Sequence, residues 1–401
     1  MTARAASLAL LGLAACAGSP RPKTVFDATS PAGAAKASND FSFDLFEAVG
    51  PGESNLISSP FSAAAALSMA AAGARGATRD EMLRTLHVDP AQVDKAHASF
   101  GQLLATLNSR DSQGNVELRV ADRLWGKRGY TFQPAFLDLV RDDYGAALEA
   151  VDFERTAEAA EQINAWIAQQ TRDRIPHLVS PDALGPQVRL VLTNAVYFKG
   201  AWSKPFRLTE TSRRPFATPD GARPAPIMAQ TSDFAYLQDG DVQIVELPYR
   251  GGLSMVVVLP PEGRSLRKVL ALLARNYDRW MASLHGQEVD LWLPRWTTRS
   301  TLPLNGPLES LGLRLAFSTS ADFSGMASEP LQIDSVLQQA FVQVDEVGTE
   351  AAAATAIMMV AVSLEEKPPP QVFHADHPFI YLLRDQATGA ILFVGQVVDP
   401  G

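Results

Sequence analysis

The side chains that could carry out catalysis do not form a pattern that hydrolases use. The chain has six histidines, and neither a Gly-x-Ser-x-Gly nor a His-Glu-x-x-His motif accompanies them. Four histidines, at positions 87, 97, 177 and 285, are isolated. His374 and His377 flank Asp376 in a predicted turn, where a structural role is favoured over metal binding. A Ser-His-Asp hydrolase is therefore disfavoured, and we expect neither a metal nor another cofactor.

A segment near the C-terminus has the most unusual composition in the chain. From Gly348 to Ala356 it contains only glycine, threonine, glutamate and alanine, and an apolar run and then a polar, proline-rich run follow to Gln371. Thr349 could cap a helix that the alanines propagate. That helix would have only about two or three turns and no apolar stripe to dock it. As a strand, the segment would instead place a row of small or uncharged side chains on one face. These side chains are Thr349, Ala351, Ala353, Thr355 and Ile357.

The elements that must position this segment are predicted from periodicity. Asn39 and Asp40 precede apolar residues at helical spacing, so the first helix should begin there. A second helix should follow Ser59 and Pro60, with the serine as its cap. Helical patterns such as 157–171 crowd the first half of the chain and β-rich runs crowd the second, which favours an α+β fold with mostly antiparallel sheets. The clearest β-rich runs are 190–198, 242–247, 253–259, 289–293 and 390–398.

Composition excludes several classes of protein. A chain of 401 residues with 46% hydrophobic and 20% charged residues can bury a large core. We find no interior linker or repeat, so we expect one large domain. The formal net charge is −9, and no Lys/Arg-rich run is present to neutralise phosphates, which argues against a nucleic-acid partner.

The single cysteine, Cys16, is informative about the cellular localisation of the protein. It follows an apolar run too short to span a bilayer, and Leu13-Ala14-Ala15-Cys16 resembles a bacterial lipoprotein signal. This resemblance implies that residues 1–15 are removed, that Cys16 is lipidated, and that residues 16–38 form a flexible tether to a domain at 39–401. Ala17 favours the outer membrane or cell surface of a Gram-negative bacterium. An ordinary secretory signal with an incidental cysteine is the alternative.

The segment at 348–356 resembles the reactive-loop hinge of inhibitory serpins, a family of serine protease inhibitors. Other motifs resemble further serpin blocks in the family's order, and together they cover about residues 39 to 400. These motifs are NLISSPFS (55–62), LSM (67–69), GARGAT (73–78), INAW (163–166), TNAVYFKGAW (193–202), ELPY (246–249), ADFSGM (321–326), ADHPF (375–379) and ILFVG (391–395).

The serpin resemblance implies both a fold and a mechanism. The fold would have three β-sheets, eight or nine helices and an exposed reactive-centre loop at about 346–371. The protein would be a suicide substrate and not an enzyme: a serine protease cuts the loop, forms an acyl-enzyme, and is trapped when the loop inserts into the central sheet. The implied hinge residues are Glu346, Gly348, Thr349, Glu350, Ala351, Ala352, Ala353, Ala354 and Thr355. Their small size favours an inhibitor over the alternative, a non-inhibitory carrier or chaperone.

The resemblance also implies a scissile bond. In the family this bond usually lies fourteen residues after the hinge glycine, which from Gly348 gives Val362–Ser363. That bond suits elastase-like or subtilisin-like proteases. The loop is longer on its C-terminal side, so Leu364 is the alternative scissile residue and would suit a chymotrypsin-like protease. We expect the inhibitor to be a monomer.

Further residues match serpin positions where the central sheet opens. Trp202 should lie near the point where the loop enters the sheet. The family commonly has His-Lys where this chain has Gln338-Gln339. We expect Gln338 to hydrogen-bond Asn194 nonetheless, but without a protonatable group at this position. The residues expected to line the opening are Ser58, Ser59, Ser62, Asn194 and Gln338.

Overall fold

A computed structural model describes residues 29–108, 116–349 and 368–401. Eight α-helices lie within these ranges: α1 (Pro31–Val49), α2 (Pro60–Gly73), α3 (Gly76–Thr85), α4 (Val93–Asn108), α5 (Pro134–Tyr144), α6 (Thr156–Gln170), α7 (Leu266–Ser283) and α8 (Asn305–Ser310). Five of them precede residue 150, whereas most strands follow residue 190. The fold is therefore α+β with the segregation that the sequence predicts.

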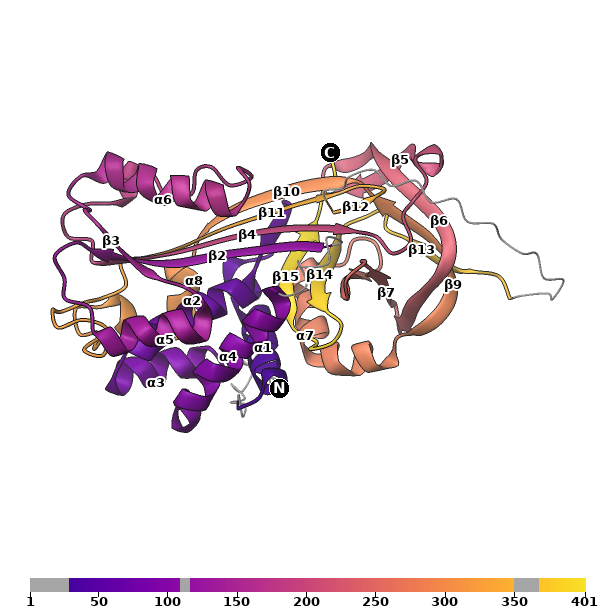
Figure 1. Ribbon diagram of the computed structural model, residues 1–401. Helices are drawn as coiled ribbons and strands as arrows, with labels where there is room; N and C mark the ends of the chain where they lie inside the picture. Colours follow the sequence, from indigo (N-terminus) through magenta and orange to yellow (C-terminus); the bar gives the residue numbers. More distant parts are fainter. Residues whose placement is uncertain (1–28, 109–115, 350–367) are drawn as a thin grey trace, which may run out of the picture.

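The described strands form two hydrogen-bonded sheets (Figure 1). The six-stranded sheet has the order β10 (Trp296–Pro303), β11 (Ser335–Val344), β12 (Gly348–Thr349), β4 (Leu190–Ala201), β2 (Val116–Lys127) and β3 (Leu148–Val151). The nine-stranded sheet has the order β1 (Leu56–Ser58), β15 (Ile391–Val397), β14 (Phe379–Asp385), β8 (Leu253–Leu259), β7 (Val242–Pro248), β6 (Gly221–Asp239), β9 (His285–Pro294) and β13 (Gln371–His374), with β5 (Ser212–Thr218) paired to β6.

Helix α2 lies at the centre of the molecule, between the two sheets. It contacts β2 and β4 of the six-stranded sheet and β15 of the other. Small residues make up most of its sequence, and all but one of its fourteen residues are buried. Small side chains let a helix backbone approach two sheets closely, which explains why such an alanine-rich helix is fully enclosed.

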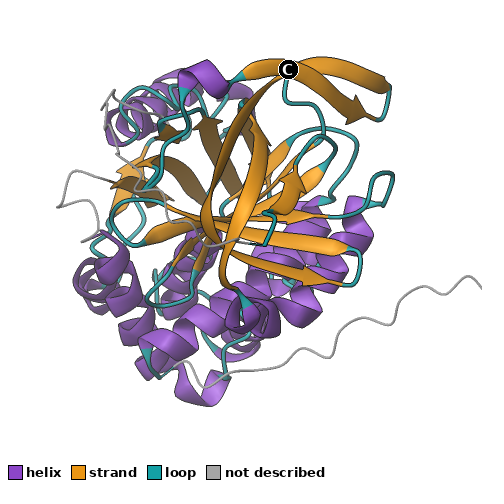
Figure 2. Cartoon of the chain, turned by 90° about the vertical axis from the view of Figure 1, so that its right-hand side faces the viewer, coloured by secondary structure: helices purple, strands orange, loops and turns teal. Residues whose placement is uncertain are grey.

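The six-stranded sheet is covered on both faces (Figure 1). On one face, side chains of β2 and β4 pack with α6 around Trp125 and Ile163. On the other face, the main core joins the sheet to α1, α2, α4 and α5. Figure 2 shows most helices gathered below the strands, with α6 apart from them. Because strands alternate sides, even-numbered residues of β2, β4 and β11 face α2 and the main core.

The first helix begins earlier than predicted. Ser30 accepts a hydrogen bond from the Gly33 N–H and caps a helix that starts at Pro31. Ala34, Ala35 and Ala37 are buried in the main core. The prediction of a tether as far as residue 38 and of a domain beginning at 39 is therefore wrong at this boundary. Burial of the alanines explains the difference, since propensity alone rarely stabilises a helix.

The third sheet expected from the serpin resemblance is not confirmed among the described strands. The 19-residue strand β6 pairs with β5 near its start, with β9 along its middle and with β7 at its end. One long strand thereby joins the hairpin β5–β6 and the strands around β8 into a single hydrogen-bonded sheet. A twisted strand of this length can belong to two packing layers while its ladder stays continuous.

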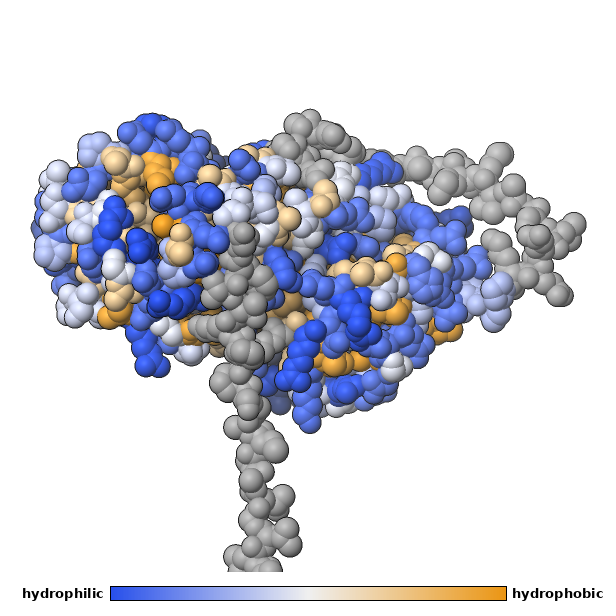
Figure 3. Space-filling view, turned by 90° about the horizontal axis from the view of Figure 1, so that it is seen from below, coloured by the Kyte–Doolittle hydropathy of each residue, from blue (hydrophilic) through white to orange (hydrophobic). Residues whose placement is uncertain are grey.

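The surface of the described residues is mixed in character. Figure 3 shows mostly hydrophilic residues on the face seen from below, with small hydrophobic areas among them. Leu208 and Val372 are the only large hydrophobic side chains in the described ranges that are strongly exposed. In the same ranges, no helix has both the length and the apolar character needed to cross a membrane.

Candidate functional site

The six-stranded sheet is split at one end by strand β12 (Figure 1). Strands β4 and β11 are parallel neighbours and pair directly over residues 191–197 and 335–341. Beyond these pairs they separate, and β12 lies between them. Thr349 of β12 is opposite Gly200 of β4 and Val344 of β11, and it runs antiparallel to both. The sheet is therefore partly opened, and a third strand has begun to fill the opening.

Gly348 lets β12 approach β4 closely. A Cβ atom added to Gly348 would lie 2.0 Å from the carbonyl oxygen of Gly200 and 2.8 Å from the Cα of Ala201. Both contacts are with backbone atoms, which cannot rotate away as a flexible side chain would. Glycine is therefore required at this position for β12 to form.

Thr349 is anchored in an aromatic pocket. It is fully buried, and its hydroxyl is hydrogen-bonded to that of Tyr249 at 2.7 Å. Tyr249 stacks on Trp202 with ring centroids 4.2 Å apart and meets the edge of Phe198. Burial raises the pKa of Tyr249 well above its ordinary value, so its hydroxyl stays neutral. The pocket holds a small, uncharged side chain at position 349.

The three residues that follow β11 are fixed by backbone hydrogen bonds. The indole N–H of Trp202 donates to the carbonyl of Asp345 at 3.0 Å, and the backbone N–H of Trp202 donates to the carbonyl of Val347 at 2.9 Å. The N–H of Phe206 donates to the carbonyl of Glu346 at 2.8 Å. Trp202 therefore lies beside the point at which the chain turns into β12.

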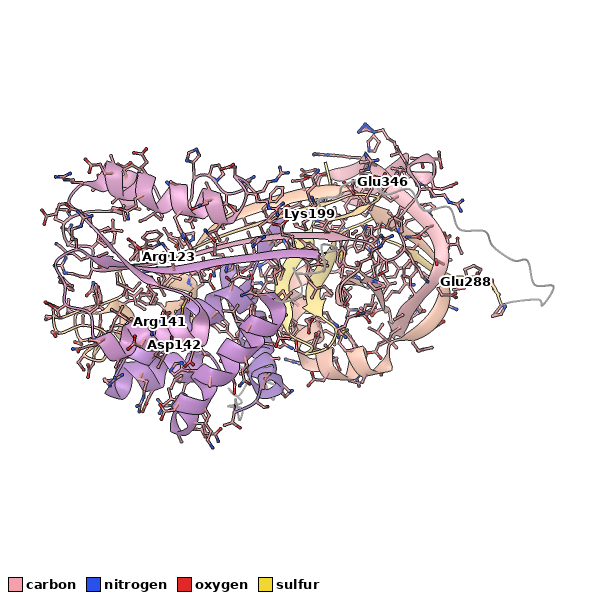
Figure 4. All side chains as sticks on the ribbon, viewed as in Figure 1. Arg123, Arg141, Asp142, Lys199, Glu288 and Glu346 are labelled. Atoms are coloured by element: carbon pink, nitrogen blue, oxygen red, sulfur yellow. The ribbon has the colours of Figure 1, made fainter. Side chains whose placement is uncertain are left out.

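Glu346 lies at the same end of the sheet (Figure 4), where its side chain forms an ion pair with Arg295. One of its carboxylate oxygens accepts a hydrogen bond from Nε of Arg295 at 2.7 Å and another from the hydroxyl of Thr211. Burial by itself would raise the pKa of Glu346, but the hydrogen bonds from Arg295 and Thr211 outweigh it and hold the pKa below its ordinary value. Glu346 is thus ionised near neutral pH, and its side chain is held in place by Arg295 and Thr211.

A buried polar network ties β4 to β11 where the two strands still pair. Gln338 donates through Nε2 to Oδ1 of Asn194 at 2.6 Å and to the carbonyl of Ser59 at 2.8 Å. Its Oε1 accepts from the hydroxyl of Ser58 at 2.7 Å and from the N–H of Ser59 at 2.9 Å. The predicted hydrogen bond between Gln338 and Asn194 is confirmed, and the network links both strands to the start of α2.

The network continues from Asn194 to strand β2. The amide nitrogen of Asn194 donates to the hydroxyl of Ser62 and to Oδ1 of Asp122, and the hydroxyl of Ser62 donates to the same oxygen at 2.7 Å. Ser59 occupies the cap position of α2, but its hydroxyl donates to the carbonyl of Leu392 at 2.7 Å. Ser59 is therefore the N-cap residue, as predicted, but its side chain does not bond to the helix, because β15 offers it an acceptor.

The structure places the sheet-opening residues in two groups. Ser58, Ser59, Ser62, Asn194 and Gln338 form the polar network, whereas Trp202 lies beside β12, eight residues after Asn194 in the chain and just past the end of β4. At about 3.3 Å per residue, the two groups are separated by somewhat more than 20 Å of strand. Both groups lie along one line, the seam between β4 and β11.

Several predicted residues lie outside the described ranges. The described part of the hinge ends at Thr349. The scissile candidates and the lipidation site also fall beyond it. The predicted residues concerned are Cys16, Glu350, Ala351, Ala352, Ala353, Ala354, Thr355, Val362, Ser363 and Leu364.

Sequence reasoning missed Asp122, Tyr249 and Arg295. Asp122 had a usable signal: it stands between Val120 and Leu124, at a core-facing position of an alternating strand, where a charged residue is unexpected. Tyr249 and Arg295 come from strand ends far away in sequence, and only the folded structure brings them to β12.

The histidines near the C-terminus are occupied in separate contacts. His374 bonds to Asp290 at 2.9 Å and stacks on Trp292, while His377 bonds to Asp376 and to the carbonyl of Pro260. Across the part of the chain that the structure describes, no group of three or more His, Cys, Asp or Glu side chains is arranged to hold a metal.

Comparison with known proteins identifies the family. The model of the family "Serpin (serine protease inhibitor)" matches residues 36–400. The chain is a serpin. Its fold is the serpin fold, which is that of a family of serine protease inhibitors. The matched range begins within α1, in agreement with the early start of that helix.

Individual relatives are similar over most of their length. A serpin-like protein of Thermococcus kodakarensis, which is uncharacterised, is 39% identical over 91% of this chain and 85% of its own. The leukocyte elastase inhibitor of Sus scrofa is 37% identical, over 91% and 98%. Among solved structures, Serpin48 of the insect Tenebrio molitor has a TM-score of 0.81 and 31% identity, over 91% and 98%. Thyroxine-binding globulin in complex with thyroxine has a TM-score of 0.82 and 26% identity, over 91% and 99%.

Proposed function

We propose that this serpin is an irreversible suicide-substrate inhibitor of serine proteases, which traps the acyl-enzyme by inserting its cleaved loop into the six-stranded sheet. The observation that carries this proposal is β12. Its two residues already lie between two parallel strands and pair with both. The chain that follows β12 therefore needs only to continue in the same direction to become a full central strand.

The register of β12 predicts where the following residues would go. Each further residue of the loop would lie opposite the preceding residue of β4 and of β11. Ala351 would then lie beside Phe198, and Ala353 beside Val196, both of which face the main core. The core-facing positions of the loop are thus the ones that carry small or uncharged side chains, as the sequence pattern requires.

Insertion would exchange a short ladder for a longer one. The parallel pairs between 191–197 and 335–341 would break, and the new strand would form antiparallel ladders with both neighbours. A net gain of about ten hydrogen bonds, at about 1 kcal/mol each, corresponds to roughly 10 kcal/mol. The uncleaved protein is metastable in this proposal, because the loop cannot reach this state while both its ends are attached.

The target is proposed from the residues at the predicted bond. Val362 before Ser363 suits elastase-like or subtilisin-like proteases, and the similarity to leukocyte elastase inhibitors supports this class. Cleavage after Leu364 by a chymotrypsin-like protease is the alternative. A small aliphatic residue fits a shallow, apolar specificity pocket, whereas leucine needs a deeper one.

The location is also a proposal. The lipoprotein-like sequence that ends at Cys16 supports export and lipid anchoring, at the outer membrane or cell surface of a Gram-negative bacterium. Because α1 begins at Pro31, the tether would end at residue 30 and would be about two thirds as long as the sequence predicts. We propose that the anchored inhibitor acts as a monomer.

A denaturing gel tests the proposed function. The purified protein without residues 1–16 is mixed with elastase, subtilisin or chymotrypsin, and with the same proteases whose catalytic serine has been blocked. We expect a band with the mass of the protease plus that of the inhibitor without its released C-terminal peptide, with an active elastase-like or subtilisin-like protease only, because the link is an ester to the catalytic serine.

Mass spectrometry of the released C-terminal peptide identifies the bond. A peptide that begins at Ser363 supports the elastase-like or subtilisin-like class, and one that begins at Glu365 supports the alternative. Clean cleavage without any adduct, with every protease, would favour a non-inhibitory carrier and contradict the proposal.

A further inference from the structure

The carboxyl group of Asp122 lies in the network that holds the sheet closed. Asp122 is directly opposite Asn194 in the pairing of β2 with β4. Its Oδ1 accepts hydrogen bonds from Ser62 and Asn194. Its Oδ2 is buried and has no hydrogen-bond partner among the described residues, although the residue as a whole is only half-buried. One carboxylate oxygen is therefore cut off from both water and donors.

Within the described ranges, no cation forms an ion pair with this carboxyl group. Helix α2 and strand β11 contain no ionisable side chain. The ionisable residues of β4, Tyr197 and Lys199, are at odd-numbered positions and so face away from Asn194 and Asp122. The charged residues of β2, other than Asp122, are likewise at odd-numbered positions. Figure 4 marks Arg123, whose guanidinium packs over the ring of Trp166 of α6.

Two further buried titratable groups on the core side belong to α4 and α5. His97 of α4 bonds through Nδ1 to the hydroxyl of Tyr144 of α5 at 2.7 Å. Burial lowers the pKa of His97 to about 4, so its imidazole is neutral near pH 7. Burial raises the pKa of Tyr144 far above neutrality. Neither group supplies a charge that would stabilise an Asp122 carboxylate.

Burial therefore dominates the titration of Asp122. It raises the pKa of this carboxyl to about 7, and the hydrogen bonds from Ser62 and Asn194 offset only part of the rise. In the closed sheet the group is protonated below neutral pH. Where water reaches it, its pKa should return toward the ordinary value near 4.

Opening of the sheet acts directly on the partner of Asp122. Asn194 donates to Asp122 and accepts from Gln338. If the loop inserts in the register of β12, Thr355 would lie between Asn194 and Gln338, so the bond between these two side chains must break. Separation of the two strands at this point admits water beside Asn194, and hence to the carboxyl behind it.

We propose that Asp122 is the titratable residue that sets the pH dependence of strand insertion. This inference rests on the proposed function. Below neutral pH the closed sheet retains a proton on Asp122 that the opened sheet releases, so opening becomes easier as the pH rises. Above the pKa that Asp122 has in the closed sheet, its carboxyl is ionised in both forms, and a further rise in pH no longer favours opening. The rate of insertion should therefore rise between about pH 5 and pH 7 and level off above pH 8.

The same ionisation has a defined effect on the stability of the uncleaved fold. The pKa of Asp122 is higher in the folded than in the unfolded chain. Its contribution to stability is therefore fully present below about pH 4 and is lost as the pH rises through about 7. The isosteric variant Asp122→Asn should lose this slope. A melting curve measured across this range reports the titration without any requirement for insertion.

Peptide annealing measures the opening itself. A synthetic peptide with the sequence of residues 349–360 is mixed with the uncleaved protein, and complex formation is followed on native gels from about pH 5.5 to pH 8. We expect the annealing rate of the wild type to rise about tenfold across this range. The Asp122→Asn variant should change less than about twofold. Asp142→Asn removes a strongly exposed carboxyl and should behave as the wild type does.

The outcomes separate this inference from the proposed function. A wild type and an Asp122→Asn variant that anneal with the same pH profile would overturn the role of Asp122 while leaving the inhibitor proposal intact. Failure of the peptide to anneal at any pH would contradict the proposed insertion, and the inference with it. If Asp122→Asn does not fold, Asp122→Ser serves as a second variant that cannot titrate, with the same expected result.

Discussion

An arginine at position 349 should abolish inhibition while leaving cleavage intact. Thr349 is fully buried in β12, and its hydroxyl bonds to Tyr249. The nearby carboxylate of Asp345 already accepts hydrogen bonds from the N–H groups of Val347 and Gly348, so burial of a guanidinium group at position 349 should cost several kcal/mol. The charge should expel β12 from the sheet and slow insertion of the loop. Hydrolysis of the acyl-enzyme should then be faster than insertion, and the protease should be released.

Titration of an active elastase-like protease measures this effect. We expect the yield of covalent adduct to fall at least about tenfold in Thr349→Arg, with a matching increase in cleaved product, since about 1.4 kcal/mol changes a rate ratio tenfold. Thr349→Ser keeps the hydroxyl and should stay close to the wild type. Val372→Arg adds the same charge at an exposed site on β13 and should have little effect. A wild-type adduct yield from Thr349→Arg would show that β12 does not lead insertion.

Removal of the Trp202 side chain should loosen β12 and destabilise the uncleaved protein by about 3–5 kcal/mol. The indole is buried, stacks on Tyr249 and donates to the carbonyl of Asp345. In Trp202→Ala the pocket around Thr349 would lose one wall and the turn before β12 would lose a donor. Trp202→Phe should cost less, because the stacking face is retained.

Denaturant unfolding and amide hydrogen exchange together check this second prediction. We expect faster exchange at Gly348 and Thr349 in Trp202→Ala, in addition to the lower midpoint. Trp166→Ala is the matched control, since it removes a partly buried indole on α6, far from β12. Its midpoint should fall less, and exchange at β12 should not change. A Trp202→Ala variant with wild-type exchange at β12 would contradict the structural role assigned to the indole.

Regular elements with strong local patterns were predictable from the sequence. The run at 253–259 is β8 at the same bounds, and the runs at 190–198 and 242–247 lie within β4 and β7. Helix α2 starts at the predicted proline. These segments have continuous apolar or alanine-rich sequences, so their type depends little on distant contacts.

Elements that depend on tertiary contacts were harder to predict. Residues 31–38 were predicted to be a tether because they lack an apolar period, yet three of their four alanines are buried against the rest of the fold. The hydroxyl of Ser59 donates a hydrogen bond to the carbonyl of Leu392 and makes none to its own helix. Asp122 was overlooked because its role arises from Asn194 and Ser62, which approach it from other elements. Long-range partners of this kind are not encoded in local spacing.

The thermal stability of the protein before and after loop cleavage tests the central claim most directly. A non-target protease cuts the loop, both forms are purified, and their melting temperatures are compared by calorimetry. Insertion worth roughly 10 kcal/mol should raise the melting temperature of the cleaved form by on the order of 10–20 °C. An equal or lower melting temperature after cleavage would contradict the claim that the cleaved loop inserts into the six-stranded sheet and stabilises the protein.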